Sequence, residues 1–226
     1  MDNQEPEILS EEQKPQESSV FKDGQATTEV PTDGVYEIHQ NPGKLVVTYK
    51  DGKKNGETVI YDEDNKIRNR MMYQDDQLHG QMIIYQEGSE AVDMTMVYKN
   101  NILDGPMKGF YPSEEKRFEG TYVKGKLEGD FIFYDEFSDI CQKTTYKGGL
   151  RDGVSATYFP KSQGGGACQV SHYEKGLLVQ NQDMFYSTGE LLQRTPYQKG
   201  KATAYPSILN KDGKALINPA NKNRGE

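Results

Sequence analysis

Apolar and polar positions alternate along this chain in a block that repeats from residue 49 almost to the end. Each block holds a short β-forming run, such as Thr58 to Ile60 or Phe131 to Phe133, then a polar turn and a second run. Each second run ends at a tyrosine, and the tyrosines are separated by 24, 25, 24, 24, 27 and 24 residues: Tyr49, Tyr73, Tyr98, Tyr122, Tyr146, Tyr173 and Tyr197. A fixed period of this length indicates repeated structural units, and each unit is predicted to be a β-hairpin.

Residues that tolerate a positive φ follow every tyrosine at a fixed distance. The third residue after each tyrosine is one of Gly52, Asp76, Asn101, Gly125, Gly149, Gly176 and Gly200. The seventh is one of Gly56, Gly80, Gly105, Gly129 and Gly153, whereas the last two units have Gln180 and Ala204 there. We therefore expect tight glycine-bearing turns to join successive hairpins, with degenerate units at the carboxyl end.

A second aromatic row lies twelve residues after the tyrosines: Tyr61, Tyr85, Phe110, Tyr134, Tyr158 and Phe185. Both aromatic rows are predicted to form the core of their units, because a thin sheet has little else to bury. The alternative is that rings which are only half covered line a groove that grips a partner.

The repeats define the domain boundaries. The array is expected to cover residues 34–218, with about seven units, a partial unit before Tyr49 and a last hairpin over residues 207–218. Residues 1–33 contain nine acids and two bases, so we expect a disordered acidic tail there. Residues 219–226 are expected to be a flexible carboxyl-terminal tail, and Gly164 to Gly166 a longer loop that accounts for the 27-residue spacing.

Composition narrows the classes of partner. The net charge is −8, but residues 34–200 hold 24 acids and 20 bases, without a visible cluster of Lys and Arg. Such a chain is not expected to bind nucleic acid, and membrane binding is unlikely on the same ground. No apolar run approaches the ~20 residues that span a bilayer, so we expect a cytoplasmic protein, although a signal peptide removed before Met1 would leave no trace.

We expect no catalytic residue, cofactor or metal site. Cys141 and Cys168 each lie five residues before their tyrosine, and equivalent positions in neighbouring hairpins are about 9.5 Å apart, beyond the reach of a disulfide. Both are predicted to be free thiols, unless the glycine loop between them shifts the register. His39, His79 and His172 lack metal-ligand spacing, and the glycine loop is not followed by the Lys-Ser/Thr of a phosphate-binding loop.

The segment from Phe118 to Gly129 resembles a MORN repeat, in which an aromatic and an acidic residue precede a glycine, a second aromatic and two turn glycines. Phe118, Glu119, Gly120, Tyr122, Gly125 and Gly129 match this pattern, and the resemblance covers about residues 36–218. The other units replace Gly120 by Val47, Met71, Met96, Thr144, Ser171 and Thr195, and are more similar to divergent bacterial MORN-variant repeats of proteins often labelled antitoxin-like. The resemblance implies an all-β, elongated, single-layer antiparallel sheet of consecutive hairpins.

Three functions follow from this reading. The main hypothesis is a non-catalytic scaffold that binds a protein partner, with a possible homodimer through sheet ends or edges. The alternative, implied by the resemblance alone, is an antitoxin or immunity-like protein that neutralises a toxin. A phospholipid-associated adaptor follows only from the family name and has no support from the charge distribution.

Overall fold

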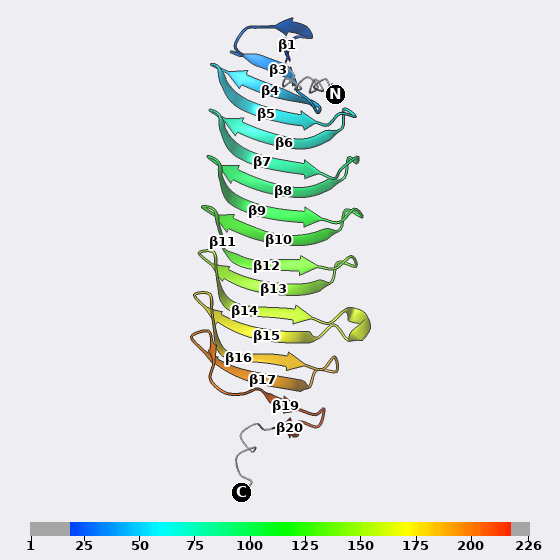
Figure 1. The fold of residues 1–226 in the computed structure, drawn as a ribbon, viewed down its shortest axis with the longest axis vertical. Coiled ribbons are helices and arrows are strands. Elements are labelled where there is room, and N and C mark those ends of the chain that lie inside the picture. The colour runs from blue at the N-terminus through cyan, green and yellow to red at the C-terminus, as the bar shows by residue number, and fades with distance from the viewer. Residues whose placement is uncertain (1–18, 218–226) are drawn as a thin grey trace, which may run out of the picture.

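The computed structural model describes residues 19–217, which form one open antiparallel sheet whose strands follow one another in chain order from residue 34 onward (Figure 1). The main strands are β3 (Gly34–His39), β4 (Lys44–Lys50), β5 (Lys53–Tyr61), β6 (Ile67–Gln74), β7 (Gln77–Tyr85), β8 (Val92–Lys99), β9 (Ile102–Phe110), β10 (Lys116–Val123), β12 (Gly129–Tyr134), β13 (Ile140–Lys147), β14 (Leu150–Tyr158), β15 (Ala167–Glu174), β16 (Leu177–Phe185) and β17 (Leu191–Gln198). The prediction of consecutive hairpins in one long single-layer sheet is confirmed.

Short elements complete the sheet. They are β1 (Ser19–Lys22), β2 (Gln25–Thr27), β11 (Lys126–Leu127), β18 (Lys201–Ala202), β19 (Ser207–Leu209), β20 (Ala215–Ile217) and the 3-10 helix η1 (Lys161–Gln163). β19 and β20 pair as the last hairpin predicted from the sequence. Among the described residues, no helix is long and apolar enough to cross a membrane.

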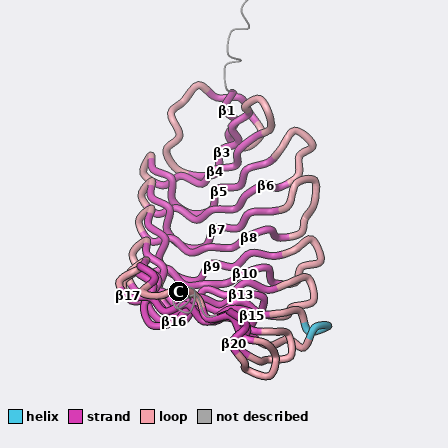
Figure 2. Tube along the Cα trace, turned by 60° about the horizontal axis from the view of Figure 1, so that its bottom comes forward, coloured by secondary structure: helices cyan, strands magenta, loops and turns pink. Residues whose placement is uncertain are grey.

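The turns after the tyrosines all use the left-handed region of the backbone. All seven residues predicted from the sequence have a positive φ, and so does the residue before each of them, as in Lys124 (48°) and Gly125 (77°). Two consecutive positive φ values define a type I′ turn, whose twist matches that of antiparallel strands. The backbone N–H of Gly125 also donates to the carbonyl of Leu103, 2.7 Å away near the start of β9, and each of the other turns makes an equivalent bond. The turns therefore stack along one edge of the sheet, opposite the longer loops (Figure 2).

Most strand pairs contain one register shift, which lies near the turn or near the loop. The pairing register shifts near the turn between Val47 and Tyr49, for example, and near the loop at Arg117, which is an extra residue between two paired neighbours. Gly105, at the first kind of shift, has a φ of 148°, and a Cβ there would lie 2.8 Å from that of Val97. Such bulges bend a strand and increase its twist. The second glycine of each unit thus lies at a bend beside the next hairpin.

The expectation of a disordered tail up to residue 33 is wrong for residues 19–27. β1 and β2 form a hairpin, and β1 pairs with β3 from Ser19 to Lys22. Asp23 and Gly24 form another turn with two positive φ values, and the ring of Phe21 packs 4.8 Å from that of His39. An Asp-Gly pair between short apolar runs is a hairpin signal that the acidic composition concealed. Residues 1–18 and the tail predicted at 219–226 lie outside the described residues.

Candidate binding face

Antiparallel pairing aligns equivalent residues of all the hairpins into rows that run along the sheet. One row lies two residues before each tyrosine and continues across the strands between; we call it the central row. It comprises Tyr36, Val47, Thr58, Met71, Met82, Met96, Met107, Gly120, Phe131, Thr144, Ser155, Ser171, Gln182 and Thr195. Val47 is 0% exposed and Tyr36, Thr58 and Ser171 are 1% exposed. Most of the buried side chains lie in this row, and Val59 and Ala156 are buried on the opposite face at 5% exposure each.

A second row lies on the same face, beside the central row and nearer the loops; we call it the flanking row. It comprises Ile38, Leu45, Ile60, Asn69, Ile84, Met94, Gly109, Phe118, Phe133, Gln142, Thr157, Gln169, Met184 and Gln193. Apart from buried Gly109, its residues are half-buried or exposed, with Phe133 37% exposed. Because a single layer can bury a side chain only beneath its neighbours, the flanking row and the tyrosines cover the sides of the central row, which forms the floor of this face.

The two aromatic rows do not form the fully buried core predicted for them. All thirteen rings are half-buried, and they divide between the two faces. The tyrosines border the central row, as shown by the edge-to-face contact of Tyr49 with Tyr36 at 5.5 Å. The second aromatics lie on the opposite face, where Lys44 and Lys116 stand over the rings of Tyr61 and Tyr134. Residues between each pair of aromatics supply the core instead.

The opposite face carries a row of charged side chains along its middle. Its middle row alternates with the central row and contains seven charged residues: Glu37, Arg70, Lys108, Glu119, Lys143, Asp183 and Arg194. Several form ion pairs between neighbouring strands, including Asp130 with Lys143 at 2.7 Å and Asp183 with Arg194 at 2.7 Å. No residue of the central or flanking row is charged. The two faces therefore differ over these rows, and we call the face with the central and flanking rows the uncharged face. Its charged residues lie outside the two rows, where Lys54 and Arg151 stand over the rings of Tyr73 and Tyr173 on the turn side.

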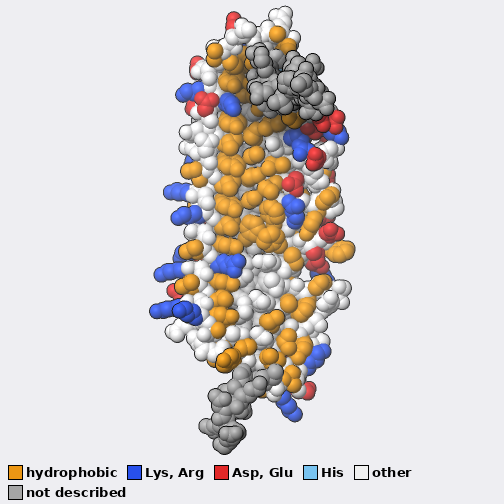
Figure 3. Space-filling view, viewed as in Figure 1, with side chains coloured by type: hydrophobic (Ala, Val, Ile, Leu, Met, Phe, Trp, Pro, Cys, Tyr) orange, Lys and Arg blue, Asp and Glu red, His pale blue; other side chains and the backbone are white. Residues whose placement is uncertain are grey.

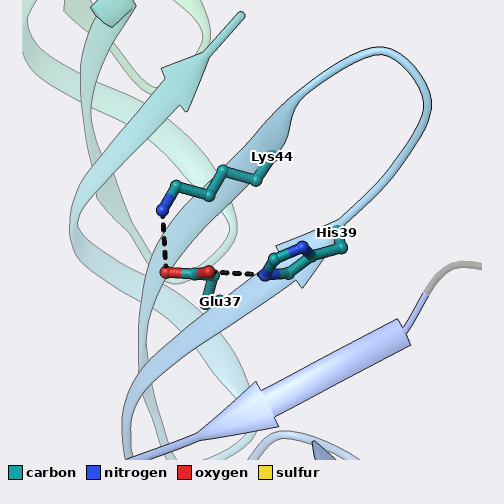
Figure 4. A network of polar contacts seen from close by, with 3 residues as sticks. All are labelled: Glu37, His39 and Lys44. Carbon is teal, nitrogen blue, oxygen red and sulfur yellow. Dashed lines mark hydrogen bonds and ion pairs between the residues drawn. The ribbon is translucent and has the colours of Figure 1, made fainter. Parts of the chain in front are cut away.

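Two carboxylates illustrate how the charged face is held. The hydroxyl of Tyr134 donates to Glu119 over 2.5 Å, and this bond, with that from Lys116, holds the pKa of Glu119 below its ordinary value despite partial burial. Burial acts to raise the pKa of Glu37, but bonds from Lys44 at 3.2 Å and His39 at 2.5 Å outweigh it and lower that pKa (Figure 4). These groups are satisfied within the sheet.

The uncharged face changes character along its length. As far as Phe131 and Phe133 the two rows are apolar except for Thr58 and Asn69. Beyond them, the two rows contain only Gln, Ser and Thr, apart from Met184. Figure 3 shows this as a broad apolar stripe over the upper two-thirds of the face that gives way to uncharged polar side chains. We call the first part, from β3 to β12, the apolar half, and the remainder the polar half.

Three phenylalanines end the apolar half. Phe118, Phe131 and Phe133 lie with ring centroids 5.1 to 6.0 Å apart. The ring of Phe118 covers Gly109 and that of Phe131 covers Gly120, where a Cβ would lie 2.3 and 2.4 Å from the respective ring. Gly120, the glycine of the sequence motif, thus makes room for an aromatic ring from the next strand.

Hydrogen bonds between side chains organise the polar half. The hydroxyls of Thr144 and Ser155 lie 2.8 Å apart, and Gln182 Nε2 donates to Ser171 Oγ over 3.2 Å. In the apolar half, by contrast, the buried hydroxyl of Thr58 has no hydrogen-bond partner among the described residues. The polar half is therefore internally satisfied, whereas the apolar half offers mainly hydrophobic surface.

Chemistry-bearing side chains do not converge in the described part of the chain. Cys141 and Cys168 are free thiols, as predicted, and each is the extra residue at a bulge near the loops. Within residues 19–217, no three His, Cys, Asp or Glu side chains are grouped so that they could hold a metal ion. No protein-family model matches the chain, and neither does any curated protein.

Proposed function

We propose that this protein is a non-catalytic interaction module that binds a protein partner on its uncharged face. The observation that carries the proposal is the complete exclusion of charge from the 28 positions of the central and flanking rows, in a chain whose residues are 27% charged. Burying an unpaired charge in an interface is costly, and the cores of interfaces are depleted of charge for that reason. A face that stayed in water would not need this exclusion in its half-buried flanking row.

The size of the surface also fits a partner. The apolar half crosses nine strands, so eight intervals of ~4.8 Å give it a length of about 38 Å. A contiguous apolar surface that is exposed and bordered by polar residues is typical of a binding site for another protein. The resemblance to MORN repeats also supports an interaction module, and it does so independently of the geometry of the sheet.

The test is a comparative capture experiment with two matched variants of β7. Ile84 belongs to the flanking row beside Asn69, so Ile84→Asp places a charge on the uncharged face next to an existing polar neighbour. Ile83→Asp places the same charge on the opposite face, between Arg70 and Thr95. We expect the wild type and Ile83→Asp to retain the same partners, and Ile84→Asp to lose them. Equal capture by all three proteins would contradict the proposal, provided that circular dichroism shows each variant folded.

A further inference from the structure

Four loops beside the apolar half are strongly acidic, and the fold brings them together from four separate hairpins. Loops 62–66, 86–91, 111–115 and 135–139 contain ten Asp and Glu residues and one Lys. The next three loops, 159–166, 186–190 and 210–214, contain two acids and three bases. The sheet places all of these loops along one edge (Figures 1 and 2). Acidic loops therefore border the apolar half and not the polar half.

Charged residues at the bulges lie between the flanking row and these loops, and they do not change the balance. Arg117 pairs with Asp93 at 3.1 Å, and Arg68 occupies the equivalent bulge in β6. With Asp93, Arg68 and Arg117 included, the loop-side border of the apolar half holds eleven acids and three bases. A ligand of the apolar half thus meets a hydrophobic floor and, on the loop side, a negative margin. The turn side differs, since residues 50–54, 74–77, 99–102 and 123–126 hold six Lys and three Asp.

The backbone of the floor restricts the conformation of such a ligand. Strands β4 to β10 are each paired on both sides, so their N–H and C=O groups are already used within the sheet. An extended peptide lying across this floor would leave its own backbone groups without partners over apolar surface, which is costly. An α-helix satisfies its backbone internally and presents one apolar stripe.

From the hydrophobic floor, the acidic margin and the saturated backbone, we propose that the apolar half binds a basic amphipathic helix of a partner protein. The helix lies along the sheet with its apolar stripe on the Met, Ile and Phe side chains and its Lys or Arg residues toward the acidic loops. The floor of about 38 Å accommodates about 26 helical residues at 1.5 Å each. This inference rests on the proposed function and specifies the chemistry of the partner.

The test uses synthetic peptides of about 26 residues, a length set by the rise of the helix. One contains Leu on a single helical face and Lys elsewhere, a second has Glu in place of every Lys, and a third has the Leu and Lys residues in scrambled order. Binding is measured by fluorescence anisotropy with the full chain. We expect the patterned Leu/Lys peptide to bind at least about tenfold more tightly than either of the others, which corresponds to ~1.4 kcal/mol.

Two sets of variants locate the binding. Ile84→Asp is expected to weaken the patterned peptide at least about tenfold, and Ile83→Asp to leave it within about twofold, since only the former interrupts the apolar contact. The combination Glu63→Gln, Glu87→Gln, Glu114→Gln and Glu136→Gln removes one exposed acid from each acidic loop. It is expected to weaken binding and to reduce its dependence on salt, because fewer charges are then screened.

The outcomes separate this inference from the broader function. Equal binding of the Lys and Glu peptides would overturn the proposal that the ligand is a basic helix. Binding that Ile84→Asp does not weaken would overturn it too. So would a dimer of the chain itself, seen in sedimentation and abolished by Ile84→Asp. If these results occurred while the capture of cellular partners still depended on Ile84, the proposal of an interaction module would be retained. Only the proposal of a basic helix as its ligand would be rejected.

Discussion

The packing of Phe131 over Gly120 predicts that restoring a larger side chain at this glycine destabilises the protein. Equivalent positions hold Val47 and Met71, so comparison of the repeats alone would favour Gly120→Val. In the structure, however, a Cβ at Gly120 would lie 2.4 Å from the ring of Phe131, and the ring must move. Overpacking of this kind costs about 1–3 kcal/mol, whereas replacing a glycine within a strand regains only about 0.5–1 kcal/mol. We therefore expect a net loss of about 1–2 kcal/mol in the free energy of unfolding.

A double variant tests the cause. Val47 pairs directly with Thr58 elsewhere in the central row, so Gly120→Val combined with Phe131→Thr rebuilds a pair that the array already contains. Phe131→Thr alone should cost less than the ~3–5 kcal/mol of a fully buried phenylalanine, because its ring is half-buried. If the clash is the cause, the double variant is destabilised by at least ~1 kcal/mol less than the sum of the single variants.

Equilibrium urea unfolding followed by far-ultraviolet circular dichroism gives the three free energies. Because repeat arrays can depart from two-state unfolding, amide hydrogen exchange in β10 and β12 should accompany it as a local measure. A Gly120→Val variant within about 0.5 kcal/mol of the wild type, or strict additivity in the double variant, would refute the packing argument.

Three further predictions concern single positions. Thr58→Val should stabilise the protein by about 1 kcal/mol in urea unfolding, because it removes a buried hydroxyl without a partner; a loss of stability would show that the hydroxyl is satisfied. Gly125→Val should cost about 1–2 kcal/mol through its positive φ, whereas Gly125→Asn should be nearly neutral, since Asn101 has the same conformation with a φ of 65°; equal costs would contradict the turn assignment. The pKa of Glu119 is lowered in the folded protein, so the ionised carboxylate stabilises the fold at pH values above its ordinary pKa of 4.5. This stabilisation is lost as the pH falls through the folded-state pKa. The difference in urea midpoint between the wild type and Glu119→Gln should therefore shrink on acidification, and a difference independent of pH would exclude this linkage.

The sequence by itself determined the hairpins, their order and their turns. These features depend on local chemistry, since a residue such as Gly125 or Asn101 adopts a positive φ because of its own side chain, and β-forming runs flank each turn. The same reasoning applies to Asp23 and Gly24, where the signal was present but the surrounding acidic composition outweighed it. The period then fixed how many hairpins follow one another.

Only the tertiary structure decided which positions are buried and which face is free of charge. Two residues before each tyrosine, Val47, Met71 and Thr144 look like unrelated departures from the repeat motif, yet pairing across strands aligns them in one buried row. The same stacking gathers acidic loops from four separate hairpins along one border of the apolar half. Burial and charge segregation arise from contacts between residues half a repeat or one repeat apart, which no local pattern specifies. These contacts place the candidate binding face beside the row of repeat tyrosines.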